Sequence, residues 1–149
     1  MAVKLIDALL GEHGAFNALF NSIEKLDDAA VELAQIENAT AALAAELDSH
    51  AAFEEELLFP ALTPHLADDA LIAELHADHV AIRAGLERIE EARDIREAMD
   101  AVHQTLALAR GHFRKEEERL YPLAHKILDG TAQSRLGEAW AAARAVETG

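Results

Sequence analysis

One eleven-residue pattern occurs twice in the chain and constrains its fold more than any other feature. Both copies read His-x-x-x-Glu-Glu-Glu-x-Leu-aromatic-Pro, the first over residues 50–60 and the second over residues 112–122. Each copy follows a segment with its own acidic residue and histidine side by side, Glu12-His13 in one case and Asp78-His79 in the other. Duplication of a two-helix unit is the simplest origin of this order.

Apolar residues recur at helical spacing around both copies, in four long segments. These residues are Ile6, Leu9, Leu10, Phe16, Leu19, Phe20 and Ile23 in the first segment, Leu43, Leu47, Leu57 and Leu58 in the second, Ile72, Leu75, Ile82, Leu86 and Ile89 in the third, and Met99, Val102, Leu106, Ala109, Phe113, Leu120 and Leu123 in the fourth. The alternation typical of strands is missing. We therefore expect an all-α fold, an antiparallel up-down-up-down four-helix bundle with a short C-terminal fifth helix.

The expected ends of the helices follow from helix-breaking and capping residues. Pro60 and the Thr63-Pro64 pair predict the break between the second and third helices. Asp94, with Glu97 three residues later, predicts the start of the fourth. We expect the bundle to occupy residues 1–128 and to end at Gly130-Thr131. The remaining segment, 129–149, is expected to form a short helix over residues 132–146 that packs on the bundle or trails it.

Composition excludes several functional classes. The chain of 149 residues has no cysteine, which rules out disulfide scaffolds, thiol catalysis and iron–sulfur clusters. Its 13 basic and 28 acidic residues give a net charge of −15, so we expect no nucleic-acid and no membrane partner. Residues 1–10 lack the features of a signal peptide, and we expect a cytoplasmic protein.

Six residues of ligand type stand at core positions of the expected helices. Residues four apart share a helix face, so His50 can meet Glu54, and His112 can meet Glu116. His13 and His79 interrupt the apolar faces of the first and third helices. Burial of each such group costs about 1–3 kcal/mol or more unless a hydrogen bond, an opposite charge or a metal ion compensates. The sequence therefore predicts a metal centre with the ligands His13, His50, Glu54, His79, His112 and Glu116.

The other histidines and glutamates have weaker claims to the site. His65, His103 and His125 are expected on the surface, because a turn or the helical angle directs them elsewhere. His76 lies one turn before His79 and stays open as a further ligand or as a gate. The glutamates that follow each ligand glutamate are expected mostly in solvent, with a supporting contact to the ligands left open for Glu55 or Glu117. These residues are Glu55, Glu56, Glu117 and Glu118.

The order His13, His50-x-x-x-Glu54, His79, His112-x-x-x-Glu116 resembles the hemerythrin-like HHE cation-binding family over about residues 1–128. The resemblance implies a four-helix bundle with a non-haem centre of two iron ions and an oxo or hydroxo bridge. It also implies that His13 and His50 serve one iron, His79 and His112 the other, and that Glu54 and Glu116 bridge them. Manganese and zinc remain alternatives to iron.

The sequence departs from oxygen-carrying hemerythrins in two helices. Those proteins carry two histidines four apart in the third helix and an aspartate five residues after the histidine of the fourth. Here His76 and His79 are three apart, and Glu116 follows His112 by four. With roughly six ligands per iron, about 12 positions need filling; the six residues and a bridging oxygen would fill about 10, leaving about two for water or substrate.

Open positions on a di-iron centre favour a protein that binds or reacts with a small oxidant: dioxygen, nitric oxide or peroxide. The sequence shows no catalytic triad, phosphate-binding loop or basic groove. Iron handling, as ferroxidase, store or sensor, is the alternative, because an acidic surface attracts ferrous ions. A plain helical bundle with incidental histidines is the third hypothesis.

Overall fold

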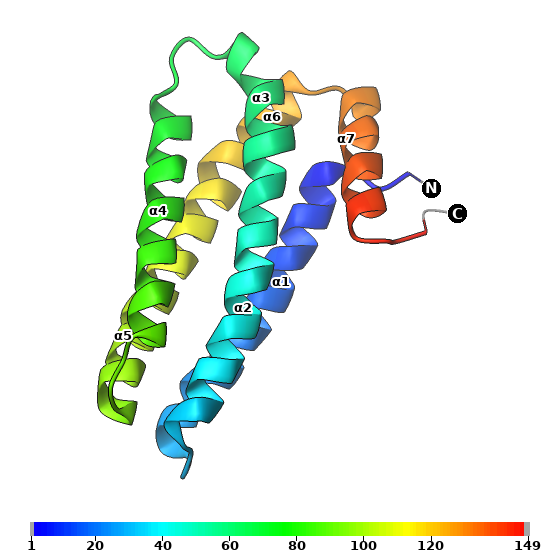
Figure 1. The fold of residues 1–149 in the computed structure, drawn as a ribbon. Helices are drawn as coiled ribbons and strands as arrows, with labels where there is room; N and C mark the ends of the chain where they lie inside the picture. Colours follow the sequence, from blue (N-terminus) through cyan, green and yellow to red (C-terminus); the bar gives the residue numbers. More distant parts are fainter. Residues whose placement is uncertain (1, 148–149) are drawn as a thin grey trace.

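Four long helices form the body of the protein in the computed structural model, which describes residues 2–147. They run alternately up and down (Figure 1), as expected, and no strand occurs among the described residues. The four helices are α1 (Leu5–Glu24), α2 (Leu33–Phe53), α4 (Ala70–Glu90) and α5 (Ile95–Lys115). The connections α1–α2 and α4–α5 lie at one end of the bundle and the connection to α4 at the other. The expected all-α bundle is confirmed.

The start of α5 follows the predicted capping residues. The Asp94 carboxylate accepts a hydrogen bond from the backbone N–H of Glu97 at 2.8 Å. The Glu97 side chain in turn accepts one from the backbone N–H of Arg93. The first contact satisfies a donor that the first helical turn leaves free, and the second ties the residue before the N-cap to that turn.

The chain does not break at Pro60, so this prediction was wrong. After α2 comes a five-residue π-helical turn, Glu54–Leu58, and the chain continues as α3 (Phe59–Leu62) through Pro60. In the π turn the backbone N–H groups reach back five residues, as Phe59 does to Glu54. The wider turn gives the proline ring, which has no N–H to donate, room within a helical path. The helical path ends only after a 3₁₀ turn, Thr63–His65.

The second copy of the pattern repeats this geometry. A π turn, Glu116–Leu120, leads from α5 into α6 (Tyr121–Ile127). The extra residue in each turn shifts the apolar register: in the first copy Leu58 is fully buried, whereas Leu57 is only partly buried. Both π turns begin at a predicted ligand glutamate, and π turns are common at functional sites.

Two apolar clusters fill the bundle, and a polar layer separates them. One cluster contains Phe16, Phe20, Leu43, Leu47, Ile82, Leu86, Leu106 and Phe113 with their neighbours. The other contains Leu5, Leu9, Leu58, Phe59, Leu75, Leu120 and Tyr121 with theirs. Leu10 and Leu19 belong to neither, at 38% and 42% exposed. Each follows or precedes a core residue, and a helix turns by about 100° per residue.

The last helix, α7 (Gly130–Ala143), packs beside α1 (Figure 1). Gly130 begins this helix, with Asp129 as its N-cap, so the helix starts two residues before the expected residue 132 and ends at Ala143 rather than at residue 146. A side chain at Gly137 would collide with the carbonyl oxygen of Val3, which shows how closely α7 approaches the start of the bundle. Within residues 2–147, none of the helices has the length and hydropathy needed to cross a bilayer.

Candidate metal centre

The six predicted ligand residues lie together in the polar layer between the two apolar clusters. Each is at most 6% exposed, and each of the four long helices or its π turn contributes to the group. They are His13 on α1, His50 on α2, Glu54 in the first π turn, His79 on α4, His112 on α5 and Glu116 in the second π turn. Their helical spacing and their burial agree with the sequence; their role as ligands stays a prediction.

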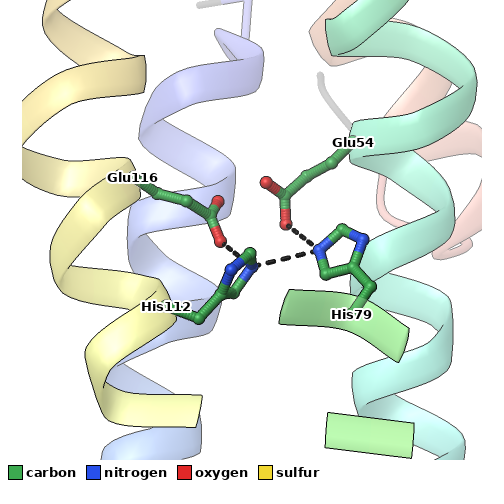
Figure 2. A group of neighbouring side chains, drawn as sticks. All are labelled: Glu54, His79, His112 and Glu116. Carbon is green, nitrogen blue, oxygen red and sulfur yellow. Dashed lines mark hydrogen bonds and ion pairs between the residues drawn. The ribbon is translucent and has the colours of Figure 1, made fainter. Parts of the chain in front are cut away.

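The inward-facing atoms of the four side chains in Figure 2 converge on one space. His79 Nε2 lies 3.0 Å from His112 Nε2 and 3.9 Å from Glu54 Oε1. His112 Nε2 lies 2.5 Å from Glu116 Oε1. Each of the four residues offers one ligand atom within 4.8 Å of the others. The group therefore has the donor set and the size of a cation site.

A second group shares one residue with the first. His13 Nε2 lies 3.3 Å from His50 Nε2 and 3.9 Å from Glu116 Oε2. His13, His50 and Glu116 also bring one ligand atom each within 4.8 Å of one another. Because Glu116 belongs to both groups, the arrangement suits two cations that share a carboxylate.

Tyr121 adds a hydroxyl group that the sequence analysis did not include. Its Oη donates a hydrogen bond of 2.8 Å to Glu116 Oε2 and lies 3.2 Å from His13 Nε2. Tyr121 is only 2% exposed, and burial raises the pKa of its hydroxyl well above the usual value. The corresponding residue of the first copy, Phe59, has no hydroxyl and stacks on His79. The two halves of the centre are therefore chemically different at this position.

Several polar atoms of the centre lack the partner that burial demands. Both carboxylate oxygens of Glu54, Oε1 of Glu116 and Nδ1 of His13 are buried and make no hydrogen bond among the described residues. His50 Nε2 nevertheless approaches Glu54 Oε1 to 2.9 Å. Burial raises the pKa of Glu54, and the nearby Glu116 carboxylate raises it further. A cation between the carboxylate oxygens would satisfy those of Glu54 and Glu116, so the residues present fit a metal centre, whereas His13 Nδ1 faces outward to Glu117.

Acidic residues on neighbouring helices hold the outer ring nitrogens of three of these histidines. His50 Nδ1 lies 3.0 Å from Glu12 Oε1, and His112 Nδ1 lies 3.2 Å from Asp78 Oδ2. His79 Nδ1 lies 2.8 Å from Glu55 Oε1. A carboxylate only accepts hydrogen bonds, so in each case Nδ1 carries the hydrogen and the lone pair of Nε2 faces the centre.

These contacts obey the internal repeat. The pair Glu12–His50 corresponds to Asp78–His112. In both pairs the acidic residue stands directly before the histidine of the preceding helix, His13 or His79, and contacts the histidine of the eleven-residue pattern. Glu55–His79 corresponds to Glu117–His13, although Glu117 Oε1 remains 3.7 Å from His13 Nδ1. Sequence reasoning left Glu55 and Glu117 open and missed Glu12 and Asp78. Their side-by-side position with His13 and His79 was the available signal.

Glu12 and Asp78 each pair with a basic side chain, and the two basic side chains come from different parts of the chain. Lys115 Nζ donates to Asp78 at 2.7 Å. The position that corresponds to Lys115 in the first copy is Phe53, which cannot donate. There α7 provides Arg144, whose guanidinium lies 4.9 Å from the Phe53 ring centroid and donates to Glu12 at 2.9 Å. The C-terminal helix thus completes the surroundings of His50.

Burial and hydrogen bonding set the charges of the centre. Burial raises the pKa of Glu12, but the contacts with His50 and Arg144 outweigh it, so the net pKa is lowered and the side chain is ionised. Burial raises the pKa of Glu55, but the contact with His79 outweighs burial, so the net pKa is lowered. Burial lowers the pKa of His13 to about 4 and also lowers that of His79. These two imidazoles are therefore neutral near pH 7, which is the form that binds metals.

A small cavity reaches the centre between α2, α4 and α5. It has about 20 Å³ of room for water-sized groups, close to what one water molecule needs. Its lining includes His50, His79 and His112 at the centre, and Asp48 and Arg83, which are half exposed. A molecule of two or three atoms fits this space, and a larger substrate does not.

The remaining histidines lie outside the polar layer. His65, His103 and His125 are exposed, as expected, and His103 pairs with Asp27 at 3.0 Å. His76 is 49% exposed, and its Nδ1 lies 3.4 Å from Glu55 Oε1. Glu55, His76 and His79 form a third group with ligand atoms within 4.8 Å of one another, at the edge of the centre.

Comparison with known proteins identifies the family. The model of the hemerythrin HHE cation-binding domain matches residues 4–124, and a second, overlapping match covers residues 70–147. The chain belongs to this family. Membership implies that the protein binds metal cations, which agrees with the buried His and Glu group. Neither the curated proteins nor the solved structures contain a match to the chain.

Proposed function

We propose that this member of the hemerythrin HHE family holds two iron ions and binds or reacts with a small oxidant: dioxygen, nitric oxide or peroxide. The observation that carries the proposal is the convergence of four buried imidazoles and two buried carboxylates whose lone pairs face one another. His13 and His50 would hold one ion, His79 and His112 the other, with Glu54 and Glu116 between them. Bound iron would supply the redox chemistry that these oxidants require.

The chain's own residues would orient and enclose this chemistry. Glu12, Asp78 and Glu55 keep the hydrogen of each histidine on Nδ1, so that Nε2 stays available for a metal. Phe113 stacks on His13 at 4.0 Å between ring centroids and excludes water from that side. Tyr121 holds a proton beside Glu116 and His13, where a hydrogen-bond donor can stabilise negative charge on an incoming oxidant.

The test is metal identity and stoichiometry, measured on protein purified without a metal-affinity tag from iron-replete cells. We expect about two irons per chain. The absorption spectrum should then change on addition of dioxygen, nitric oxide or peroxide to the reduced protein. Zinc alone, no metal at all, or an iron spectrum indifferent to all three oxidants would overturn the proposal.

Iron handling is a second candidate, and the net charge of −15 together with the half-exposed pair of His76 and Glu55 favours it. A ferrous oxidation assay separates the two functions. Many oxidised ferrous ions per chain would support a ferroxidase or store. Oxidation of only the bound ions would support the oxidant-binding function.

A further inference from the structure

We propose that Glu55, His76 and His79 form an entry site, which captures a divalent cation at the surface and passes it to the buried centre. The proposal rests on the metal centre of the proposed function and assigns the route by which that centre is filled. It concerns binding and transfer of the ion alone, with no change in its oxidation state.

The entry site is built from one buried and two partly exposed side chains. His76 is 49% exposed and Glu55 is 34% exposed, whereas His79 is only 4% exposed. Glu55 Oε1 lies 3.4 Å from His76 Nδ1 and 2.8 Å from His79 Nδ1, so the carboxylate stands between the two rings. Two imidazoles and a carboxylate form a donor set typical of first-row divalent metals.

His79 connects the entry site to the centre through its two ring nitrogens. Nδ1 faces Glu55 and His76, and Nε2 faces His112 and Glu54. A neutral imidazole has one free lone pair, so His79 cannot serve both sites at the same time. In this structure Nδ1 carries the hydrogen that it donates to Glu55, so an ion binds there only when that proton moves to Nε2. Return of the proton to Nδ1 releases the ion and frees the Nε2 lone pair for the centre. The outer site is therefore suited to transient binding and the inner site to retention.

The internal repeat supplies an independent argument. His13 corresponds to His79, Glu117 to Glu55, and Leu10 to His76. Leu10 cannot bind a metal, and Glu117 Oε1 remains 3.7 Å from His13 Nδ1. Only the His79 half of the centre, among the described residues, carries a half-exposed histidine at this position. His76 packs its ring edge-on against Phe59, 5.2 Å between ring centroids, which holds it beside Glu55.

The route for the cation differs from the cavity between α2, α4 and α5. That cavity is lined mainly by apolar side chains together with the pair Arg83–Asp48, in which Arg83 Nε lies 3.4 Å from Asp48 Oδ1. This pair is neutral overall, so the mouth of the cavity offers no net negative charge to attract a cation. The entry site instead offers a carboxylate and two imidazoles. Ions and small uncharged oxidants would thus reach the centre from different sides.

The experiment measures how fast the metal-free full chain takes up Co²⁺, followed by its visible absorption in a stopped-flow instrument. His76→Ala should slow loading about tenfold, because the capture site is lost, while the final content stays at two ions per chain. His103→Ala, which removes another half-exposed histidine paired with an acid, should load like the wild type.

The outcomes separate this proposal from the proposed function. Equal loading rates for the wild type and His76→Ala, with full final content, would overturn the entry site and leave the centre intact. A lower final content in His76→Ala would make His76 a ligand of the centre and would also overturn the entry site. A wild type that takes up no ion would contradict the proposed function itself, and the entry site with it.

Discussion

At the residue scale, we expect the outer carboxylates to set how strongly the histidines of the centre bind a metal ion. Glu12 contacts His50 Nδ1 with one oxygen and receives hydrogen bonds from Trp140 and Arg144 with the other. It is thereby fixed on both sides. A rigid, charged acceptor makes the histidine a better electron-pair donor and holds its ring in the binding orientation.

We expect Glu12→Gln to weaken metal binding about 10- to 100-fold, because an amide is a poorer acceptor for the imidazole N–H. The measurement is a competition titration with a chelator that reports on both ions. Glu46→Gln is the matched control, since Glu46 also bonds Arg144 but is 58% exposed and touches no histidine of the centre. Unchanged affinity in Glu12→Gln would show that this contact does not tune the ligand.

His13 should make the metal-free protein sensitive to acid. Its pKa is lowered to about 4 by burial, so between pH 6.5 and 4 the unfolded chain binds a proton that the folded chain does not. Stability contributed by this residue is therefore present above pH 6.5 and is lost as the pH falls towards 4, by on the order of 3 kcal/mol.

The raised pKa of Glu54 acts in the opposite sense, since the folded chain then binds the extra proton. A comparison of the wild type with His13→Gln isolates the histidine. Urea unfolding of both proteins from pH 7 to pH 4 should show the stability of the wild type falling relative to the variant. A difference that does not vary with pH would contradict the prediction.

At the scale of elements, the contact between α4 and α5 depends on a glycine. A Cβ added to Gly85 would collide with the side chain of Thr105, and Thr105 is fully buried. We expect Gly85→Ala to destabilise the protein by about 1–3 kcal/mol, because the two helices must separate. The two helices carry the proposed ligands His79 and His112, so metal affinity should fall as well.

Gly11→Ala is the control for this substitution. Gly11 also lies inside a helix, α1, but a Cβ there meets nothing within 4 Å. The same change should therefore stabilise the protein by about 0.5–1 kcal/mol through helix propensity alone. Thermal unfolding of both variants checks the pair; equal effects would show that the α4–α5 contact is not tight.

The π turns show where reasoning from local sequence fails at this scale. Pro60 predicts a break, and the proline rule is sound for an α-helix. The chain avoids a break by widening the turn before each proline. These wider turns depend on packing of α3 and α6 against the apolar cluster that contains Leu5, Leu9 and Leu75. Leu58, Phe59, Leu120 and Tyr121 are all buried there. That apolar contact is not visible in the spacing of one helix.

At the scale of the whole molecule, the metal should stabilise the fold that surrounds it. The polar layer divides the core, and without a cation its lone pairs face one another. Removal of metal by a chelator should lower the free energy of unfolding by about 4 kcal/mol when the free ion had been present at 1,000 times its dissociation constant. Calorimetry of the loaded and metal-free protein checks this.

A double variant, His50→Ala with Glu54→Ala, provides the comparison. It lacks two of the six side chains of the centre and should show a much smaller shift on chelation. An equal melting temperature for the loaded and metal-free wild type would mean that the polar layer is stable without an ion.

The helices, their antiparallel order and the composition of the polar layer could be predicted from the amino-acid pattern along the chain. The reason is local: a helix places residues four apart on one face, so His50 with Glu54, and His112 with Glu116, follow from spacing alone. The apolar residues that flank them on the same helix face indicate that this face is buried.

The pattern along one helix does not predict which side chains meet across helices; packing of the folded chain establishes these contacts. Contacts such as Glu12 with His50 and Tyr121 with His13 depend on the register between helices, which spacing within one helix does not fix. The position of Arg144 beside Glu12 depends in the same way on the packing of α7 against α1. Local geometry selects the ligand types, and packing of the whole chain selects the partners that tune them.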